Sequence, residues 1–433
     1  MTAILKQYAL HTALALTALL VVVAGMYSFT QAAPVPERVI VTFENGDTVN
    51  EQAREALENA GAQVLKELGL INGFVVLIPE QAMGGVGALS GVKTVEKDVR
   101  VYALHHRDGH DGGPPGGGGD DGSGDGGSTQ PAETLEWGVD RIDAELAWGV
   151  SRGTGIKTAI IDTGIDKDHA DLVDNIKGGV NFVAKGPAWK TADPDAWDDD
   201  NGHGTHVAGI VAAADNDIGV IGTAPEAHLY GVKVLDNRGS GYLSDVIDGI
   251  GWSVDNNMDV INMSLGCNCD TVALKDAVDN AYNAGLVLVA AAGNSGDGDG
   301  STNDVIYPAK YASVVAVSAT DENDGTPAWS SEGEEVELAA PGVSIRSTWN
   351  DGLYNTISGT SMASPHTAGV AALVLATAIP SEYDADSDGL WSPAEVRTAL
   401  RGTADDLGPE GHDTFYGHGL VDAEEATTGS ETN

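Results

Sequence analysis

The sequence predicts an α/β fold, with a mostly parallel central sheet and helices on both of its faces, preceded by a small α+β domain. In the larger part of the chain, short apolar segments alternate with longer amphipathic ones, as in β-α-β units. A run rich in Gly and Asp separates this part from a short N-terminal piece. The predicted strands include 155–164, 229–235, 258–265 and 284–294, and the helices between them include 243–254 and 271–284.

Three polar residues lie at the ends of predicted strands: Asp162, Ser264 and Asn294. Ligands of open parallel sheets bind beyond the carboxyl ends of the strands. Because these ends meet at one edge of the sheet, we expect the three side chains to gather there.

The N-terminal piece, residues 37–104, has the pattern of a compact unit. Residues 38–43 alternate like a strand, and the period of 49–61 indicates an amphipathic helix closed by Gly61. We expect a ferredoxin-like α+β domain. Its other apolar stretches are 73–78 and 92–104.

Residues 105–131 form a predicted linker, because 108–127 consist almost entirely of Gly, Asp, Pro and Ser. Such a segment cannot bury enough apolar surface to fold. Three histidines beside it could bind a metal, although histidines next to a linker are more often incidental. They are His105, His106 and His110.

Residues 1–33 have the pattern of a signal peptide: Lys6 provides a positive flank, 12–25 an apolar core, and small residues precede Pro34. The general secretory route is expected, because a twin-arginine motif is lacking. This predicts a secreted protein with no stable membrane association after cleavage. An uncleaved anchor is the alternative, because the apolar stretch can extend over 8–29.

The charge balance is strongly acidic: 65 Asp and Glu against 22 Lys and Arg give a formal net charge of −43. Nucleic acid and anionic membranes are poor partners for such a surface. The long apolar runs argue against a disordered acidic chain. Because salt screens self-repulsion, we expect a halophilic protein. Equal stability at all salt concentrations would contradict this expectation.

The sequence contains two cysteines, Cys267 and Cys269. Export permits a disulfide between them, although closing so small a ring adds little entropic stability. Free thiols are the alternative.

Four residues have ordinary roles when each is taken alone. Ser361 precedes an apolar helix as a cap would, and Asp162 and Asn294 lie close to glycines as turn residues do. His203 is three residues from His206, a spacing that suggests zinc only weakly. Together they fit one mechanism, because a nucleophilic serine needs a histidine base, the histidine needs a carboxylate, and the oxyanion needs preorganised donors.

Four segments containing these residues carry a specific resemblance: I-I-D-T-G-I-D, H-G-T-H-V-A-G, A-A-G-N and G-T-S-M-A-S-P-H. They resemble the signature segments of the subtilisin family (subtilases), in the family's order Asp, His, Ser. The resemblance runs from about Trp137 to Ala423. G-T-S-M-A lacks the final glycine of the G-x-S-x-G motif, which separates this chain from lipase-type hydrolases.

The resemblance implies a serine endopeptidase. Ser361 would be the nucleophile, His203 the general base and then acid, and Asp162 the residue that orients His203. Asn294 and the backbone N–H of Ser361 would stabilise the oxyanion. A catalytically silent subtilase acting as a binding or surface-structural protein is the alternative. The neighbours expected to be structural are His206, Ser358, Ser364 and His366.

The resemblance also implies that a substrate peptide lies extended between two edge strands, so specificity for proteins and peptides is broad. Ala291 and Gly293 resemble walls of the primary specificity pocket. Ile306 replaces a small residue of the family, which predicts a shallow pocket with an apolar preference that accepts Trp and Tyr poorly. A monomer is expected. The edge-strand residues are Gly239, Ser240, Gly241, Ser264, Leu265 and Gly266.

Residues 37–104 resemble the family's propeptide, an intramolecular chaperone and inhibitor. Its last strand would place Leu104 in the specificity pocket, so the first self-cleavage is expected after Leu104. Trimming of the linker up to about Ala132 would leave 132–433 as the peptidase domain.

Calcium is implied by the segment 214–220, which resembles the family's calcium loop. Asp171 matches the carboxylate ligand, and Glu133 lies where the family has a glutamine. Hard oxygen ligands suit Ca²⁺; a polar surface loop is the alternative. The other ligands would be Ala214, Asn216, Ile218 and Val220.

A second calcium site is predicted at 384–395, because D-A-D-S-D-G-L-W-S-P-A-E fits the spacing of an EF-hand loop. The alternative is a helix start, since S-P-A-E also makes a capping box. No organic cofactor is expected. The ligands would be Asp384, Asp386, Asp388, the Leu390 carbonyl and Glu395.

Overall fold

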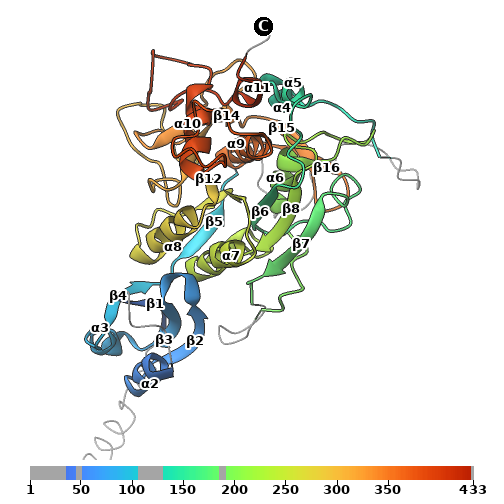
Figure 1. Cartoon of the computed structure of the whole chain (residues 1–433). Helices are drawn as coiled ribbons and strands as arrows, with labels where there is room; N and C mark the ends of the chain where they lie inside the picture. The colour runs from blue at the N-terminus through green and yellow to red at the C-terminus, as the bar shows by residue number, and fades with distance from the viewer. Residues whose placement is uncertain (1–35, 45–50, 106–129, 185–191, 431–433) are drawn as a thin grey trace, which may run out of the picture.

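The structure is a computed structural model that describes residues 36–44, 51–105, 130–184 and 192–430. The predicted signal peptide and most of the predicted linker, including His106 and His110, lie outside these ranges. Within the described ranges, none of the helices has the length and apolar character needed to cross a membrane. A small N-terminal domain packs against a large one and extends one strand into it (Figure 1).

The small domain is α+β, as predicted, with an antiparallel sheet in the order β2-β3-β1-β4. This order, with a helix after β1 and another after β3, is the ferredoxin-like arrangement. The strand β2 was not predicted, because its exposed and half-buried positions do not alternate cleanly. The elements are β1 (Glu37–Phe43), α2 (Glu51–Asn59), β2 (Gln63–Leu68), β3 (Gly73–Ile78), α3 (Met83–Gly87) and β4 (Val92–Lys97), with 3₁₀ turns at Gly69–Ile71 and Glu80–Ala82.

The large domain is built on a seven-stranded parallel sheet in the order β14-β13-β12-β10-β6-β8-β7, which confirms the predicted α/β fold. Helices cover both faces (Figure 1). The strands are β6 (Lys157–Asp162), β7 (Ile176–Asn181), β8 (His228–Lys233), β10 (Val260–Met263), β12 (Val287–Ala291), β13 (Val315–Thr320) and β14 (Val336–Pro341). The helices are α4 (Trp137–Arg141), α5 (Ala144–Ala147), α6 (His203–Ala212), α7 (Leu243–Asp255), α8 (Val272–Asn283), α9 (Thr360–Leu375), α10 (Pro393–Gly402) and α11 (Ala423–Thr428).

Side chains along each parallel strand alternate between two cores, one on each face of the sheet. In β6, Ile160 packs in the core that contains α6 and α9, whereas Ala159 and Ile161 pack in the core that contains α7 and α8. Helix α9 is buried over almost its whole length. Its N-terminus is therefore held rigidly at the carboxyl edge of the sheet.

Short strands cross this carboxyl edge. The stretch 92–104, expected to be one apolar segment, divides into β4 and a separate strand β5 (Arg100–Ala103). Strand β5 lies between β9 (Ser240–Tyr242) and β11 (Leu265–Gly266), antiparallel to both. A hairpin of β15 (Ile345–Thr348) and β16 (Tyr354–Ile357) lies elsewhere in the large domain.

Candidate active site

Asp162 and His203 form a buried pair at the carboxyl edge of the sheet. Nδ1 of His203 lies 2.8 and 2.9 Å from the two carboxylate oxygens of Asp162. A carboxylate only accepts hydrogen bonds, so Nδ1 carries the proton and Nε2 of the neutral ring keeps a lone pair. Nε2 has no hydrogen-bond partner among the described residues, so it can accept a proton.

The sequence after His203 explains how α6 can begin so close to β6. Gly204 leaves the necessary room, because a Cβ there would lie 2.2 Å from the carbonyl oxygen of Gly164. The buried carboxylate of Asp199 accepts hydrogen bonds from the N–H groups of Gly202 and Thr205, both at 3.0 Å. These bonds satisfy donors at the helix N-terminus, which have no partner within the helix.

Ser361 is the second residue of α9 and is fully buried. Its hydroxyl donates to the carbonyl oxygen of Ser264 at 2.9 Å, and the Ser264 hydroxyl donates back to the Ser361 carbonyl at 2.8 Å. The Ser264 carbonyl also accepts the N–H of Leu104 at 3.3 Å. The Ser361 hydroxyl and the N–H of Leu104 therefore donate to the same oxygen, the carbonyl oxygen of Ser264.

Asn294 follows β12 and presents its amide nitrogen to the same region. Its Oδ1 accepts hydrogen bonds from the N–H and the hydroxyl of Thr360, at 2.9 and 2.8 Å. These two donors fix the orientation of the amide. Nδ2 is buried and lacks a hydrogen-bond partner within the described part of the chain, so it is a free donor. Thr360 itself was not predicted, because a threonine at a helix start gives no catalytic signal.

The carbonyl oxygen of Leu104 lies beside this free donor. A Cβ on Gly359 would lie 2.6 Å from that oxygen and 3.3 Å from Nδ2 of Asn294. The same Cβ would lie 3.1 Å from Cα of His105, whose ring centroid is 6.0 Å from that of His203. The Leu104–His105 peptide bond thus lies between the candidate oxyanion donor and the candidate base.

The predicted substrate strands hold this segment as an extended chain. Strand β5 pairs with Ser240 and Gly241 on one side and with Leu265 and Gly266 on the other. The N–H of Ala103 also donates to the carbonyl oxygen of Gly239 at 2.9 Å. The six predicted edge-strand residues, including Ser264, therefore surround one peptide strand.

Ile306 lies against two of the residues expected to form the substrate site. A Cβ on Gly266 would lie 2.6 Å from Cδ1 of Ile306, and one on Gly293 would lie 3.3 Å from Cγ1. The isoleucine side chain thus fills space between Gly266 of the predicted edge strand and Gly293 of the predicted pocket wall. Ala291, the other predicted wall residue, is the last residue of β12 and is fully buried.

The other conspicuous histidines are buried in packing positions. Nε2 of His206 lies 3.0 and 3.1 Å from the carbonyl oxygens of Ile345 and Asn355, and burial lowers its pKa to about 3. Burial likewise lowers the pKa of His366 to about 4, and its Nδ1 lies 2.8 Å from the Met362 carbonyl. Both rings are neutral and hydrogen-bonded to backbone, as expected of structural residues.

The predicted ligands of the first calcium loop lie together. Oδ2 of Asp171 accepts the N–H of Val220 at 3.0 Å, and Oδ1 accepts the Asn216 amide at 3.1 Å. Glu133 Oε1 accepts the Asn216 N–H at 2.7 Å. Burial raises the pKa of both carboxyls, that of Asp171 to about 6, so a bound cation would favour their ionised forms. The backbone N–H of Ala214 bonds the Asp171 carbonyl, and Ile218 forms a bridge with Ala132.

The second predicted calcium loop also converges, but with one difference. Carboxylate oxygens of Asp384, Asp386 and Asp388 lie within 4.8 Å of one another. Glu395 instead bonds the N–H of Ala385 at 2.8 Å and forms a capping box with Ser392. The capping alternative is therefore present together with the aspartate cluster, and the exposed Leu390 leaves the site open to solvent.

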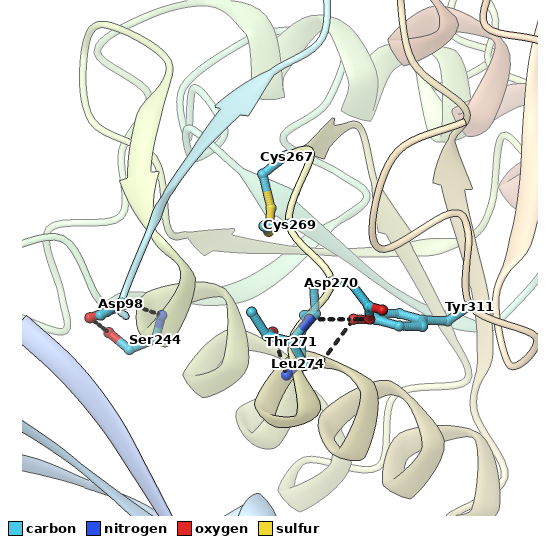
Figure 2. Close-up of a disulfide and its surroundings, with 8 residues drawn as sticks. All are labelled: Asp98, Ser244, Cys267, Cys269, Asp270, Thr271, Leu274 and Tyr311. Atoms are coloured by element: carbon cyan, nitrogen blue, oxygen red, sulfur yellow. Dashed lines mark hydrogen bonds between the residues drawn. A yellow bond between two sulfur atoms is a disulfide. The ribbon is translucent and has the colours of Figure 1, made fainter. Parts of the chain in front are cut away.

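Cys267 and Cys269 are joined by a disulfide, directly after β11 (Figure 2). Two residues further on, the Thr271 hydroxyl accepts the N–H of Leu274 and caps α8. Tyr311 holds the same turn, because its hydroxyl accepts the Thr271 N–H at 3.0 Å. The disulfide thus lies between a predicted substrate strand and the anchored start of α8.

The fold and this arrangement define a class: a doubly wound parallel sheet whose carboxyl edge carries an Asp–His pair and a serine at a helix N-terminus is typical of serine hydrolases. Residues 153–419 match the Subtilase family. The chain belongs to this family and is a subtilisin-like serine endopeptidase.

Curated relatives cover most of the chain. It is 48% identical over 296 residues to Subtilisin DY of Bacillus licheniformis, a match that covers 68% of this chain and 99% of that protein. It is 38% identical over 394 residues to Subtilisin E of Bacillus subtilis (strain 168), covering 90% of each. It is 37% identical over 424 residues to M-protease of Shouchella clausii (strain KSM-K16), covering 95% of this chain and 97% of that protein.

Proposed function

We propose that the chain is a secreted endopeptidase made as a self-processing zymogen. The observation that supports this most directly is the path of β5. Its end places the Leu104–His105 bond beside Ser361, His203 and Asn294, between the strands predicted to bind substrate. A chain bound in this way is both the first substrate of the enzyme and a block to any other.

The residues at hand supply each step of peptide hydrolysis. Ser361 Oγ attacks the Leu104 carbonyl carbon while its proton moves to Nε2 of His203. The oxyanion forms where Nδ2 of Asn294 and the N–H of Ser361 can donate. The C–N bond then breaks, the His105 amine leaves with the proton from Nε2, and water hydrolyses the ester by the same sequence in reverse.

The small domain has contacts that would keep it bound as an inhibitor. Glu96 accepts hydrogen bonds from the N–H groups of Val272 and Ala273 at the start of α8, at 2.8 and 2.9 Å. Asp98 accepts the N–H and the hydroxyl of Ser244 at the start of α7, at 2.8 and 2.7 Å (Figure 2). Carboxylates are stabilised at helix N-termini. We therefore propose 37–104 as the propeptide of a peptidase at 132–433. The pattern of the sequence alone supports 1–33 as the signal peptide.

A serine-directed fluorophosphonate tests this function against the silent-subtilase alternative. The calcium-loaded protein, once processed, should be labelled once, at Ser361. Intact mass before and after labelling measures this, with Ser364 as the internal comparison in peptide mapping. A processed protein that takes up no label would contradict the endopeptidase assignment.

Substrate preference tests the role of Ile306. The wild-type enzyme should cleave after Leu better than after Tyr, because the isoleucine fills the pocket. Ile306→Gly should raise kcat/KM for Tyr relative to Leu by about tenfold. Ile306→Leu, which keeps the volume, is the control. Equal wild-type cleavage after Leu and Tyr would refute the shallow pocket.

Calcium is proposed to stabilise the enzyme through both loops, since each presents hard oxygen ligands. Asp388→Ala should lower the number of bound calcium ions by one in equilibrium dialysis at high salt. Glu382→Gln removes an exposed charge close by in sequence and should leave that number unchanged. An unchanged number in Asp388→Ala would leave the capping box as the sole role of this segment.

A further inference from the structure

Three carboxylates outside both predicted calcium loops converge beside the candidate specificity pocket. One oxygen each from Asp297, Asp304 and Glu332 lies within 4.8 Å of the others. Asp297 and Asp304 belong to the loop after Asn294, whereas Glu332 comes from the segment before β14. The cluster therefore joins two separate parts of the chain.

Glu332 is the unusual member of this cluster. Its side chain is 0% exposed, and neither carboxylate oxygen has a hydrogen-bond partner among the described residues. The backbone closes over it, because a Cβ on Gly296 would lie 2.5 Å from Oε2 of Glu332. An ionised carboxylate is not buried in this way without a compensating charge or donor.

The neighbouring groups supply only part of that compensation, because the backbone N–H of Asp297 faces the Glu332 carboxylate whereas the side chains of Asp297 and Asp304 bring further negative charge. Asp304 Oδ1 already accepts the backbone N–H of Glu332 at 2.9 Å, and Asp297 Oδ1 accepts the N–H of Asp299 at 2.8 Å. Lys310 donates to Asn303 at 2.8 Å and lies 3.9 Å from Glu335. Three acceptors thus face one another, which requires either a cation or a shared proton.

We propose that Asp297, Asp304 and Glu332 bind a calcium ion that joins the loop after Asn294 to the segment before β14. Calcium takes carboxylate oxygens at about 2.3–2.6 Å, so one ion can contact oxygens up to about 5 Å apart. Asp297 is exposed and Asp304 is half-exposed, so water can reach the ion and complete its coordination.

The ion would stabilise the position of Asn294 through hydrogen bonds made by the residue next to Glu332. Ser331, next to Glu332, donates its N–H to the Gly293 carbonyl at 2.9 Å. Its Oγ accepts the N–H of Ser295 at 3.3 Å. The residues on both sides of Asn294 are therefore bonded to the neighbour of a calcium ligand.

Equilibrium dialysis against calcium tests the proposal independently of catalysis, with full-length Ser361→Ala as the parent to prevent self-digestion. Glu332→Gln in this parent should bind one calcium ion fewer. Glu334→Gln removes an exposed charge two residues away and should bind as many as the parent. Equal numbers in Glu332→Gln and Glu334→Gln would overturn the proposal and leave a shared proton in the cluster.

Asp297→Asn covers the case in which Glu332→Gln fails to fold, because Asp297 is exposed. Its folding is checked by circular dichroism. It should weaken the affinity for one calcium ion by at least about tenfold, since ligand charge sets calcium affinity. Parent-like affinity and number in folded Asp297→Asn would overturn the proposal equally.

Discussion

Ser361→Ala is expected to leave the chain whole at the Leu104–His105 bond and to lower kcat on peptides by about 10⁶-fold, as loss of this serine does in a subtilisin. The hydroxyl supplies the attacking atom, and the surrounding packing offers no replacement. The folded structure should survive, since the Ser264 carbonyl keeps the Leu104 N–H when the hydroxyl is removed. Intact mass after refolding with calcium in high salt measures the cleavage.

Ser364→Ala is the matched control on the same helix. Ser364 is equally buried, and its hydroxyl donates to Asn262 at 2.7 Å. Its loss should cost about 1–3 kcal/mol of stability by leaving a buried acceptor unpaired, yet self-cleavage should continue. If wild type also stays whole, the self-processing proposal fails. If Ser361→Ala is cut like wild type, another protease makes the cut.

The sequence was sufficient to predict that three candidate site residues lie at or near the ends of strands and helices. Asp162 ends a strand, His203 begins a helix, and Ser361 is the second residue of another helix. Each of these local signals is contiguous in the chain. Parallel strands then bring these ends to one edge without further information. The α/β fold and the α+β domain were predicted correctly for the same reason, because hydrophobic period and turn residues are local.

Residues whose roles depend on contacts between distant segments of the chain could not be predicted from the sequence. Thr360 orients Asn294 only because α9 begins against the loop after β12. Glu96 caps a helix that begins 176 positions later in the chain. Glu332 resembles any other glutamate of an acidic sequence until the fold buries it. In each case the sequence supplies the residue type, and tertiary packing alone supplies its partner.

Asn294→Ala is expected to lower kcat by roughly 10²–10³-fold while KM changes little, the loss that a subtilisin shows without this donor. Nδ2 has no partner in the described structure, so its removal breaks no existing hydrogen bond of that nitrogen. The donor would act only when charge develops on the carbonyl oxygen, and such interactions alter kcat rather than KM.

Thr360→Val tests the orientation of the Asn294 amide separately from hydrogen-bond donation by its Nδ2. It removes the hydroxyl that bonds Oδ1 of Asn294 but keeps the backbone N–H that bonds the same oxygen. The amide should then be oriented less firmly, and kcat should fall by less than in Asn294→Ala. In the double variant the threonine change should have almost no further effect on kcat, because its partner is already gone. This coupling is measured as kcat on one peptide for wild type, Asn294→Ala, Thr360→Val and the double variant. Full additivity would mean that Thr360 acts elsewhere, and an unchanged kcat in Asn294→Ala would remove Asn294 from the mechanism.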